Sequence, residues 1–133
     1  GFVDSKMIDL AIKKECGVIV MHRNPGSENI HQKADYEDVV DQVNTHLIIQ
    51  TENLIEKGVN RSQIAVDPGL GFGKKMEDSK ELFFNLHNLI NTYPIVVGYS
   101  RKKFTDQLNM TNNEMIDHCL DSGVDLLRLH LDN

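Results

Sequence analysis

The segment IAVDPGLGFGK at residues 64–74 decides how the chain folds. Its first three residues form a short apolar run with the length and composition of a buried β-strand. Asp67 then introduces a charge, and Pro68 with Gly69 ends the strand and turns the chain. A buried strand that stops in an acidic, glycine-rich turn is typical of an α/β protein whose ligand lies beyond the carboxyl ends of parallel strands.

The same arrangement recurs along the chain. Three further apolar runs have the character of buried parallel strands, at residues 18–21 (VIVM), 95–97 (IVV) and 126–129 (LLRL). Polar or glycine-rich residues accompany the end of each run. We expect these strand ends to lie side by side, because the carboxyl ends of parallel strands meet at one edge of a sheet.

Each strand follows a segment whose apolar residues repeat at helical spacing. The expected helices lie at 7–12, after a cap at Asp4; at 39–54, ending near Gly58; at 82–90, after a cap at Asp78; and at 111–120, opened by the capping-box pattern Thr111-x-x-Glu114 and closed by Gly123. Alternating helices and strands predict an α/β fold with a parallel sheet, because parallel strands need long crossovers.

Composition places the chain among globular proteins of one domain. The 133 residues are 40% hydrophobic and 26% charged, and the formal net charge of -6 argues against a nucleic acid or an anionic membrane surface as partner. No apolar stretch approaches the roughly 20 residues of a membrane span. Cys16 and Cys119 lie in segments that are expected to be helical, and both are expected to be buried, reduced thiols, which predicts a cytoplasmic location. The histidines and cysteines lack metal-ligand spacing, so no metal site is expected.

Asp67 and the loop after it have the chemistry of a site for a flat heterocycle. A carboxylate can accept two hydrogen bonds from an amino-pyrimidinone edge, which is the edge that a pterin offers; a simple turn role is the alternative. The loop 69–74 is neither a phosphate loop nor a dinucleotide-binding turn, because proline and lysine stand where those motifs need other residues. We expect it to be flexible, with Gly71 allowing close approach of a ligand and Phe72 available to stack.

Ser100-Arg101-Lys102 places a hydroxyl group and two cations beyond another strand. Lys102 can contact ring heteroatoms or a carboxylate of a ligand. A solvated basic turn is the alternative interpretation of this triplet.

Arg128 and His130 lie two residues apart on the last predicted strand, so they point to the same face. If that face is buried, unpaired charge there is expensive. Two such donors side by side suit a phosphate or a diphosphate, with arginine supplying a planar fork. An internal ion pair between Arg128 and a carboxylate such as Asp67 is the alternative, and it is compatible with a site.

Taken together, these stretches resemble the dihydropteroate synthases. The matching segments are 20–22 (VMH), 67–74 (DPGLGFGK), 98–102 (GYSRK) and 127–130 (LRLH), in the family's order and at roughly its spacing. The resemblance covers essentially all of residues 1–133 and implies an α/β fold of the (βα)8 TIM-barrel type. It further implies that the chain is a partial pterin-binding TIM-barrel domain that supplies about half of the barrel, strands five to eight.

The resemblance implies a transferase of folate biosynthesis. The family joins p-aminobenzoate to 6-hydroxymethyl-7,8-dihydropterin diphosphate and releases diphosphate. Holding the diphosphate while positive charge develops on the pterin methylene allows the aryl amine to attack, and Mg²⁺ is implied as a cofactor. The implied substrate-binding residues are Met21, Asp67, Gly71, Phe72, Ser100, Arg101, Lys102, Arg128 and His130, of which Lys102, Arg128 and His130 are the implied catalytic residues.

Individual roles follow by motif. Asp67 and Lys102 are expected at the pterin ring, with Met21 packing on it. Arg128 and His130 are expected to receive the diphosphate. Ser100, Phe72 and Lys102 are expected to line the p-aminobenzoate pocket, where sulfonamides compete.

The chain also departs from the family pattern. A complete barrel needs about 250 residues, roughly twice the 133 here, and Gly1-Phe2 matches the point just after the fourth strand. The family's Mg²⁺ ligand and the rest of its pterin pocket belong to the first four strands. The interval from Lys102 to Arg128 is shorter than usual. An isolated half barrel has open edges and an uncovered inner face, so we expect a homo-oligomer with little turnover of its own.

Two alternative functions share parts of this pattern. One is a non-catalytic pterin-binding or interaction module that keeps the site residues. The other is a methyltetrahydrofolate:corrinoid methyltransferase, which is also a pterin-binding barrel. Ser100-Arg101-Lys102 and Arg128-x-His130 argue against the latter, because a methyl transfer has no diphosphate to hold.

Overall fold

The computed structural model describes residues 4–23 and 35–130. In chain order the elements are α1 (Ser5–Lys14), β1 (Val18–Met21), α2 (Val39–Glu56), the 3-10 helix η1 (Arg61–Gln63), β2 (Ile64–Asp67), α3 (Met76–Phe84), η2 (Leu86–Asn88), β3 (Val96–Val97), η3 (Lys103–Gln107), α4 (Asn112–Asp121) and β4 (Leu126–Leu127). No helix in these two described ranges is long and apolar enough to cross a membrane.

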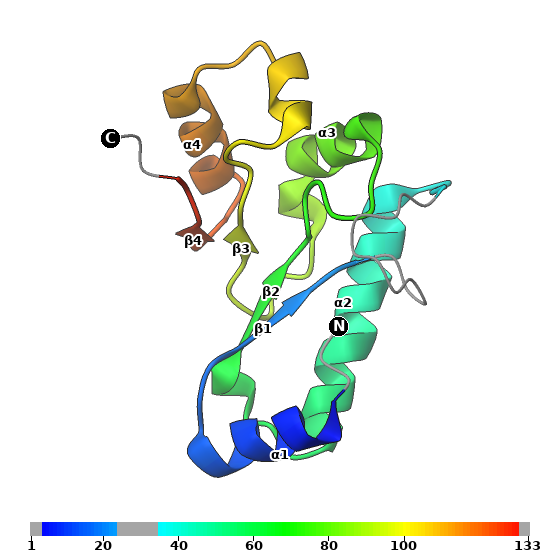
Figure 1. The fold of residues 1–133 in the computed structure, drawn as a ribbon, viewed down its shortest axis with the longest axis vertical. Coiled ribbons are helices and arrows are strands. Elements are labelled where there is room, and N and C mark those ends of the chain that lie inside the picture. The colour runs from blue at the N-terminus through cyan, green and yellow to red at the C-terminus, as the bar shows by residue number, and fades with distance from the viewer. Residues whose placement is uncertain (1–3, 24–34, 131–133) are drawn as a thin grey trace.

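The strands run through the middle of the molecule, with helices around them (Figure 1). β1 pairs with β2 in parallel, with Met21 opposite Asp67, and β3 pairs with β4 in parallel. A single parallel bridge between Val66 and Ile95 joins the two pairs, and the Val66 N–H donates to the Pro94 carbonyl at 2.9 Å. The predicted parallel α/β fold is therefore confirmed, and the described part of the chain does not form a closed barrel.

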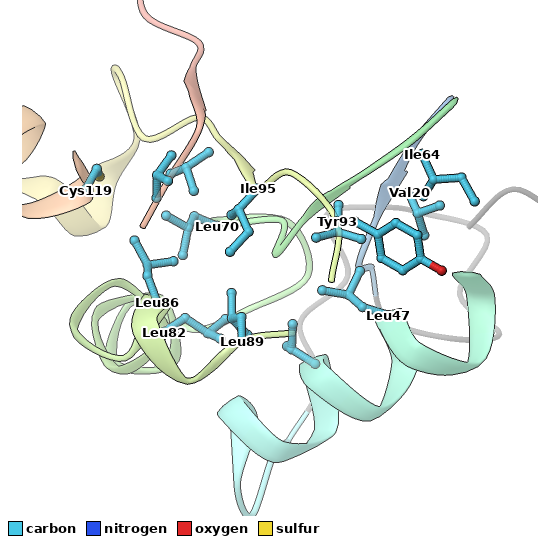
Figure 2. Close-up of a cluster of buried hydrophobic side chains, with 14 of the residues drawn as sticks. Val20, Leu47, Ile64, Leu70, Leu82, Leu86, Leu89, Tyr93, Ile95 and Cys119 are labelled. Carbon is cyan, nitrogen blue, oxygen red and sulfur yellow. The ribbon is translucent and has the colours of Figure 1, made fainter. Parts of the chain in front are cut away.

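One face of the strands packs against the helices. Figure 2 shows Val20 and Ile64 from the strands and Leu47 from α2 in one cluster of buried side chains. Val20 and Leu47 are fully buried, and burying an aliphatic side chain of this size contributes about 1.5–3 kcal/mol. This packing fixes where the strands end, and hence where the polar residues after them lie.

The opposite face of the strands is covered only in part: Val96 and Asp67 on it are buried, but its edge strands β1 and β4 are not covered. About half of Ile19 (47%) on β1 and of Leu126 (54%) on β4 remains exposed, and the register of the pairs places them on the same face. The prediction of a buried strand over 126–129 is wrong, since β4 comprises two residues and is exposed or half-buried. An apolar run does not reveal whether both faces of a strand are covered. In this sheet only one face is covered along all four strands.

Most helix ends agree with the sequence. The Asp4 carboxylate accepts a hydrogen bond from the Lys6 N–H at 2.8 Å. Both bonds of the capping box between Thr111 and Glu114 are present, at 3.0 and 3.1 Å. Gly58, with a φ of +108°, follows the end of α2 as expected.

α3 is the exception. Asp78 does not cap this helix, because the N-cap residue is Lys75 and Asp78 lies in the first turn. An acidic residue is favourable there, since it faces the positive end of the helix dipole. The helix also ends at Phe84, so that Leu86 belongs to η2 and Ile90 lies beyond it.

Candidate functional site

A charge pair joins the ends of two strands that are not neighbours. Arg128 Nη2, after β4, lies 2.8 Å from Asp67 Oδ2, at the end of β2. The Asp67 side chain is 3% exposed, whereas that of Arg128 is 57% exposed. The structure thus shows the ion pair between Arg128 and Asp67 that was the alternative to a phosphate site. The expectation that Arg128 lies on a buried face is wrong, because its face of the sheet is covered only in part, and the exposed part of the guanidinium is free to meet a ligand.

Asp67 also organises the turn after β2. Its second oxygen, Oδ1, accepts a hydrogen bond from the Gly69 N–H at 2.8 Å. The carboxylate therefore holds both the local turn and Arg128, which explains how a 2% exposed acid is tolerated. Met21 stands opposite Asp67 in the register of β1 and β2 and is half-buried.

Lys102 lies over the glycine-rich loop. Its Nζ donates to the Leu70 carbonyl and lies 4.5 Å from the centroid of the Phe72 ring, which is the geometry of a cation–π contact. A Cβ added to Gly71 would lie 3.1 Å from Lys102 Cδ. A side chain at position 71 would therefore crowd the Lys102 side chain, which lies over the loop.

Internal hydrogen bonds hold the glycine-rich loop in the conformation that the structure shows, and its predicted flexibility stays a prediction. The Phe72 N–H donates to the Gly69 carbonyl at 3.0 Å, and the Gly71 N–H donates to Ser79 Oγ at 3.0 Å. Lys74 Nζ donates to the carbonyls of Gly69 and Phe72. Glycine content alone does not reveal such bonds, because their partners come from α3 and from a buried lysine.

The Ser100-Arg101-Lys102 turn follows β3. Ser100 Oγ accepts a hydrogen bond from the His130 N–H at 3.1 Å, which ties this turn to the segment after β4. Arg101 has a φ of +60°, a conformation that non-glycine residues rarely adopt and that is often found at functional sites. Arg101 is exposed and Lys102 is half-buried. The alternative interpretation of the triplet as a solvated basic turn therefore fits Arg101 better than Lys102.

Two pockets open at these strand ends. The smaller, of about 290 Å³, is lined by Phe72, Gly98, Ser100, Lys102, Arg128, Leu129 and His130. The larger, of about 660 Å³, is lined by Gly71, Phe72, Lys74, Met76, Ser79, Ser100, Arg101, Lys102, Lys103, Phe104 and His130. The four residues common to both are Phe72, Ser100, Lys102 and His130. A third pocket, between α2 and α3, is lined instead by carboxylate and amide side chains and one valine.

The structure therefore brings most of the predicted site residues together. Seven of the nine line at least one of the two pockets. Asp67 joins them through its bond to Arg128. Met21 lies beside Asp67 on the same face of the sheet but lines neither pocket.

Burial sets the electrostatics of the two lysines. It lowers the pKa of Lys102, while the Asp67 carboxylate acts in the opposite direction and Arg128 lowers the pKa further. Burial also lowers the pKa of Lys74 to about 7, again against the effect of Asp67. Perturbed lysines in a cleft mark a candidate functional site when the geometry agrees.

Mg²⁺ does not fit the residues seen at this rim. Over the described ranges 4–23 and 35–130, no group of three or more histidine, cysteine, aspartate or glutamate side chains is placed to hold a metal ion. Of the nine predicted site residues, only Asp67 carries a carboxylate. No step of the chemistry is therefore assigned to a metal here.

Sequence reasoning missed several residues that shape the site, among them Lys74, Ser79 and Lys103. Lys74 and Ser79 hold the loop, and Lys103 adds a cation to the larger pocket. Lys103 follows the predicted triplet directly, so its position was a usable signal. Nothing in the sequence distinguishes Lys74, which is buried, from Lys75, which is exposed.

Comparison with known proteins places this arrangement in context. The model of the family described as "Pterin binding enzyme" matches residues 1–130. Among curated proteins, a dihydropteroate synthase of Streptococcus pyogenes is 30% identical over 142 aligned positions, which cover 98% of this chain and 50% of that enzyme. The chain thus spans about half the length of this relative.

Solved structures agree with this result. The dihydropteroate synthase of Xanthomonas albilineans with 4-aminobenzoic acid superposes with a TM-score of 0.80 at 26% identity, over 96% of this chain and 48% of that one. The enzyme of Anaplasma phagocytophilum with bound 6-hydroxymethylpterin-monophosphate gives 0.80 at 27% identity, over 97% and 55%. These neighbours have the TIM-barrel fold.

Proposed function

The chain belongs to the family of pterin binding enzymes, and from this premise we propose that it is part of a dihydropteroate synthase. The proposed reaction joins p-aminobenzoate to 6-hydroxymethyl-7,8-dihydropterin diphosphate. The chain would supply the last four strands of the barrel, strands five to eight. A cytoplasmic location is part of the proposal, because both cysteines are free thiols. Cys119 is buried as expected, whereas the expectation that Cys16 is buried in a helix is wrong, because α1 ends at Lys14 and Cys16 is exposed.

One observation carries the proposal: two pockets share a wall formed by Phe72, Ser100, Lys102 and His130. A reaction of two substrates needs two adjacent sites that meet where the new bond forms. Arg128 lines only the smaller pocket, which suits the diphosphate. The larger pocket has aromatic walls and cations, which suit an aryl carboxylate.

The proposed chemistry is the reaction of the dihydropteroate synthases, with the side chains of this chain in the roles that the resemblance implies. The amine nitrogen of p-aminobenzoate attacks the pterin methylene carbon, and a C–N bond forms while the C–O bond to diphosphate breaks. Diphosphate leaves with the bonding electron pair, and the amine loses a proton. Arg128 and His130 stabilise the charge on the leaving group, while Asp67 and Lys102 hold the pterin ring.

Binding experiments test the site directly. In Arg128→Ala, we expect affinity for a pterin diphosphate analogue to fall by roughly 10–100-fold, because a charge-assisted contact is lost. The affinity for 6-hydroxymethylpterin, which has no diphosphate, should change less. Isothermal titration calorimetry on the 133-residue chain measures both.

Arg61→Ala is the matched control. Arg61 lies in η1, immediately before β2 and thus at the opposite end of this strand, so the substitution makes the same change in charge away from the site. If Arg128→Ala and Arg61→Ala bind the diphosphate analogue equally well, Arg128 does not hold the diphosphate. Formation of dihydropteroate from both substrates separates the transferase from a module that only binds pterin.

A further inference from the structure

Lys74 is a charged side chain in an unusual place. It is 2% exposed, although the next residue, Lys75, is exposed and forms an ion pair with Asp35 at 2.6 Å. Burying an ammonium group is expensive unless it is hydrogen-bonded. The structure must therefore compensate Lys74 through specific contacts.

Those contacts are both made to the backbone of one turn. Lys74 Nζ donates to the Gly69 carbonyl at 2.8 Å and to the Phe72 carbonyl at 3.0 Å. The Phe72 N–H closes the same turn by donating to the Gly69 carbonyl at 3.0 Å. A single ammonium group thus braces both ends of the turn that carries Phe72.

The braced turn is central to both pockets. Phe72 lines the smaller and the larger pocket, and its ring packs under Lys102 Nζ. Lys74 itself borders the larger pocket, but its Nζ is committed to two main-chain carbonyls. Its effect on a ligand is therefore exerted through Phe72.

We propose that Lys74 is a positioning residue, whose two hydrogen bonds to the 69–72 turn hold the Phe72 ring at the wall shared by the two pockets. The consequence for substrate binding rests on the proposed function, whereas the role in the turn does not. The neutral form of Lys74 still has two N–H donors, so the brace survives loss of the proton.

Hydrogen exchange tests the role in the turn without any ligand. In Lys74→Met, we expect the Phe72 and Gly71 amide protons to exchange roughly 10–100-fold faster than in the unmodified chain, because the turn opens locally. The Val66 amide, which bonds to Pro94 between β2 and β3, should keep its rate. Lys75→Met is the control, and all these rates should stay unchanged in it.

Two results would overturn the proposal. Equal Phe72 exchange in Lys74→Met and the unmodified chain would mean that the lysine does not hold the turn. Acceleration of all amides together, Val66 included, would make Lys74 a residue of global stability only. If Lys74→Met does not fold, Lys74→Gln, which keeps an amide donor, is measured by the same criteria; failure of both to fold also counts against a positioning role.

Ligand binding then tests the consequence. The affinity for p-aminobenzoate should fall about tenfold in Lys74→Met, as expected for a displaced aromatic contact, and should not change in Lys75→Met. If the unmodified chain binds neither pterin nor p-aminobenzoate, the proposed function fails while the exchange result still stands. An exchange effect with unchanged affinity would reject the link from Lys74 to the pocket.

Discussion

Gly69 has a φ of +70°, and a Cβ placed there would lie 2.1 Å from the carbonyl oxygen of His22. Both the backbone conformation and the space therefore require glycine at this position. The residue lies where the end of β1 meets the turn after β2, so any side chain would push these two segments of the rim apart.

Gly69→Ala should accordingly lower the free energy of unfolding by about 2–5 kcal/mol, since the strain of a positive φ adds to overpacking. Gly123 provides the control, because its φ is +93° but no atom lies within 4 Å of its added Cβ. Gly123→Ala should cost only about 1–2 kcal/mol. Urea unfolding of both variants measures the difference, and equal losses would show that crowding at Gly69 is unimportant.

At the scale of residues, the sequence was informative where chemistry is unusual. An arginine in an apolar strand run suggested a partner such as Asp67, and the ion pair is present. The buried role of Lys74 was not predictable, because Lys74 and Lys75 have the same side chain and only the fold separates them. The roles of the predicted site residues in binding and catalysis stay predictions.

At the scale of elements, the contact between β1 and α2 contains two histidines, of which His22 is buried and His46 is half-buried. The rings of His22, after β1, and His46, on α2, have centroids 4.8 Å apart at right angles. The Tyr36 ring lies 6.0 Å from His22. Burial first, then Lys74 and His46, lower the pKa of His22 from 6.5 to about 2, and burial lowers the pKa of His46.

This packing predicts instability in acid. Between pH 6.5 and about 2, His22 is protonated in the unfolded chain but neutral in the folded one. Stability is therefore lost as the pH falls below 6.5, at up to about 1.4 kcal/mol per pH unit. His46 acts in the same direction. Lys74 does not contribute in this window, because it is charged in both states below about pH 7, and Tyr36 titrates at much higher pH.

Urea unfolding between pH 6 and pH 5, below the range in which Lys74 titrates, checks this prediction. His22→Asn should reduce the slope of stability against pH, whatever its effect on stability itself. His87 is exposed, so His87→Asn should leave the slope unchanged. A slope that is the same in all three chains would remove His22 as its cause.

Elements were predicted best where local chemistry defines their ends. The capping box at Thr111 and the glycine after α2 marked real helix ends. Asp78 was misleading, because an acidic residue favours the first turn of a helix as well as its cap. β4 was predicted too long, because the apolar run over 126–129 carries no information about what covers it.

At the scale of the whole molecule, the partly covered face of the sheet is the main departure from a self-sufficient domain. Ile19 and Leu126 are each about half exposed on this face. The alternation of helices and strands predicted the parallel sheet correctly. It did not predict the weak join at Val66 and Ile95, because sequence periodicity says nothing about how many bridges two strands form.

The sequence predicts association of the chain with itself, and an exposed apolar face would favour it, so the homo-oligomer stays a prediction that can be tested. Ile19→Glu should lower the fraction of larger species in sedimentation velocity, because a charge on this face would have to be desolvated. Ile49→Glu is the matched control, since Ile49 is 57% exposed on α2. Self-association that responds equally to both substitutions, or to neither, would assign the interface elsewhere.

The ion pair between Asp67 and Arg128 also bears on the folding of the chain. Its partners are 61 residues apart in the chain, and β3 and β4 must both be laid down beside β2 before the guanidinium can reach the carboxylate. Contacts of such long range form late, after the local helices and turns. If Asp67 and Arg128 form part of the ligand site, as proposed, that site is complete only once this contact between distant parts of the chain has formed.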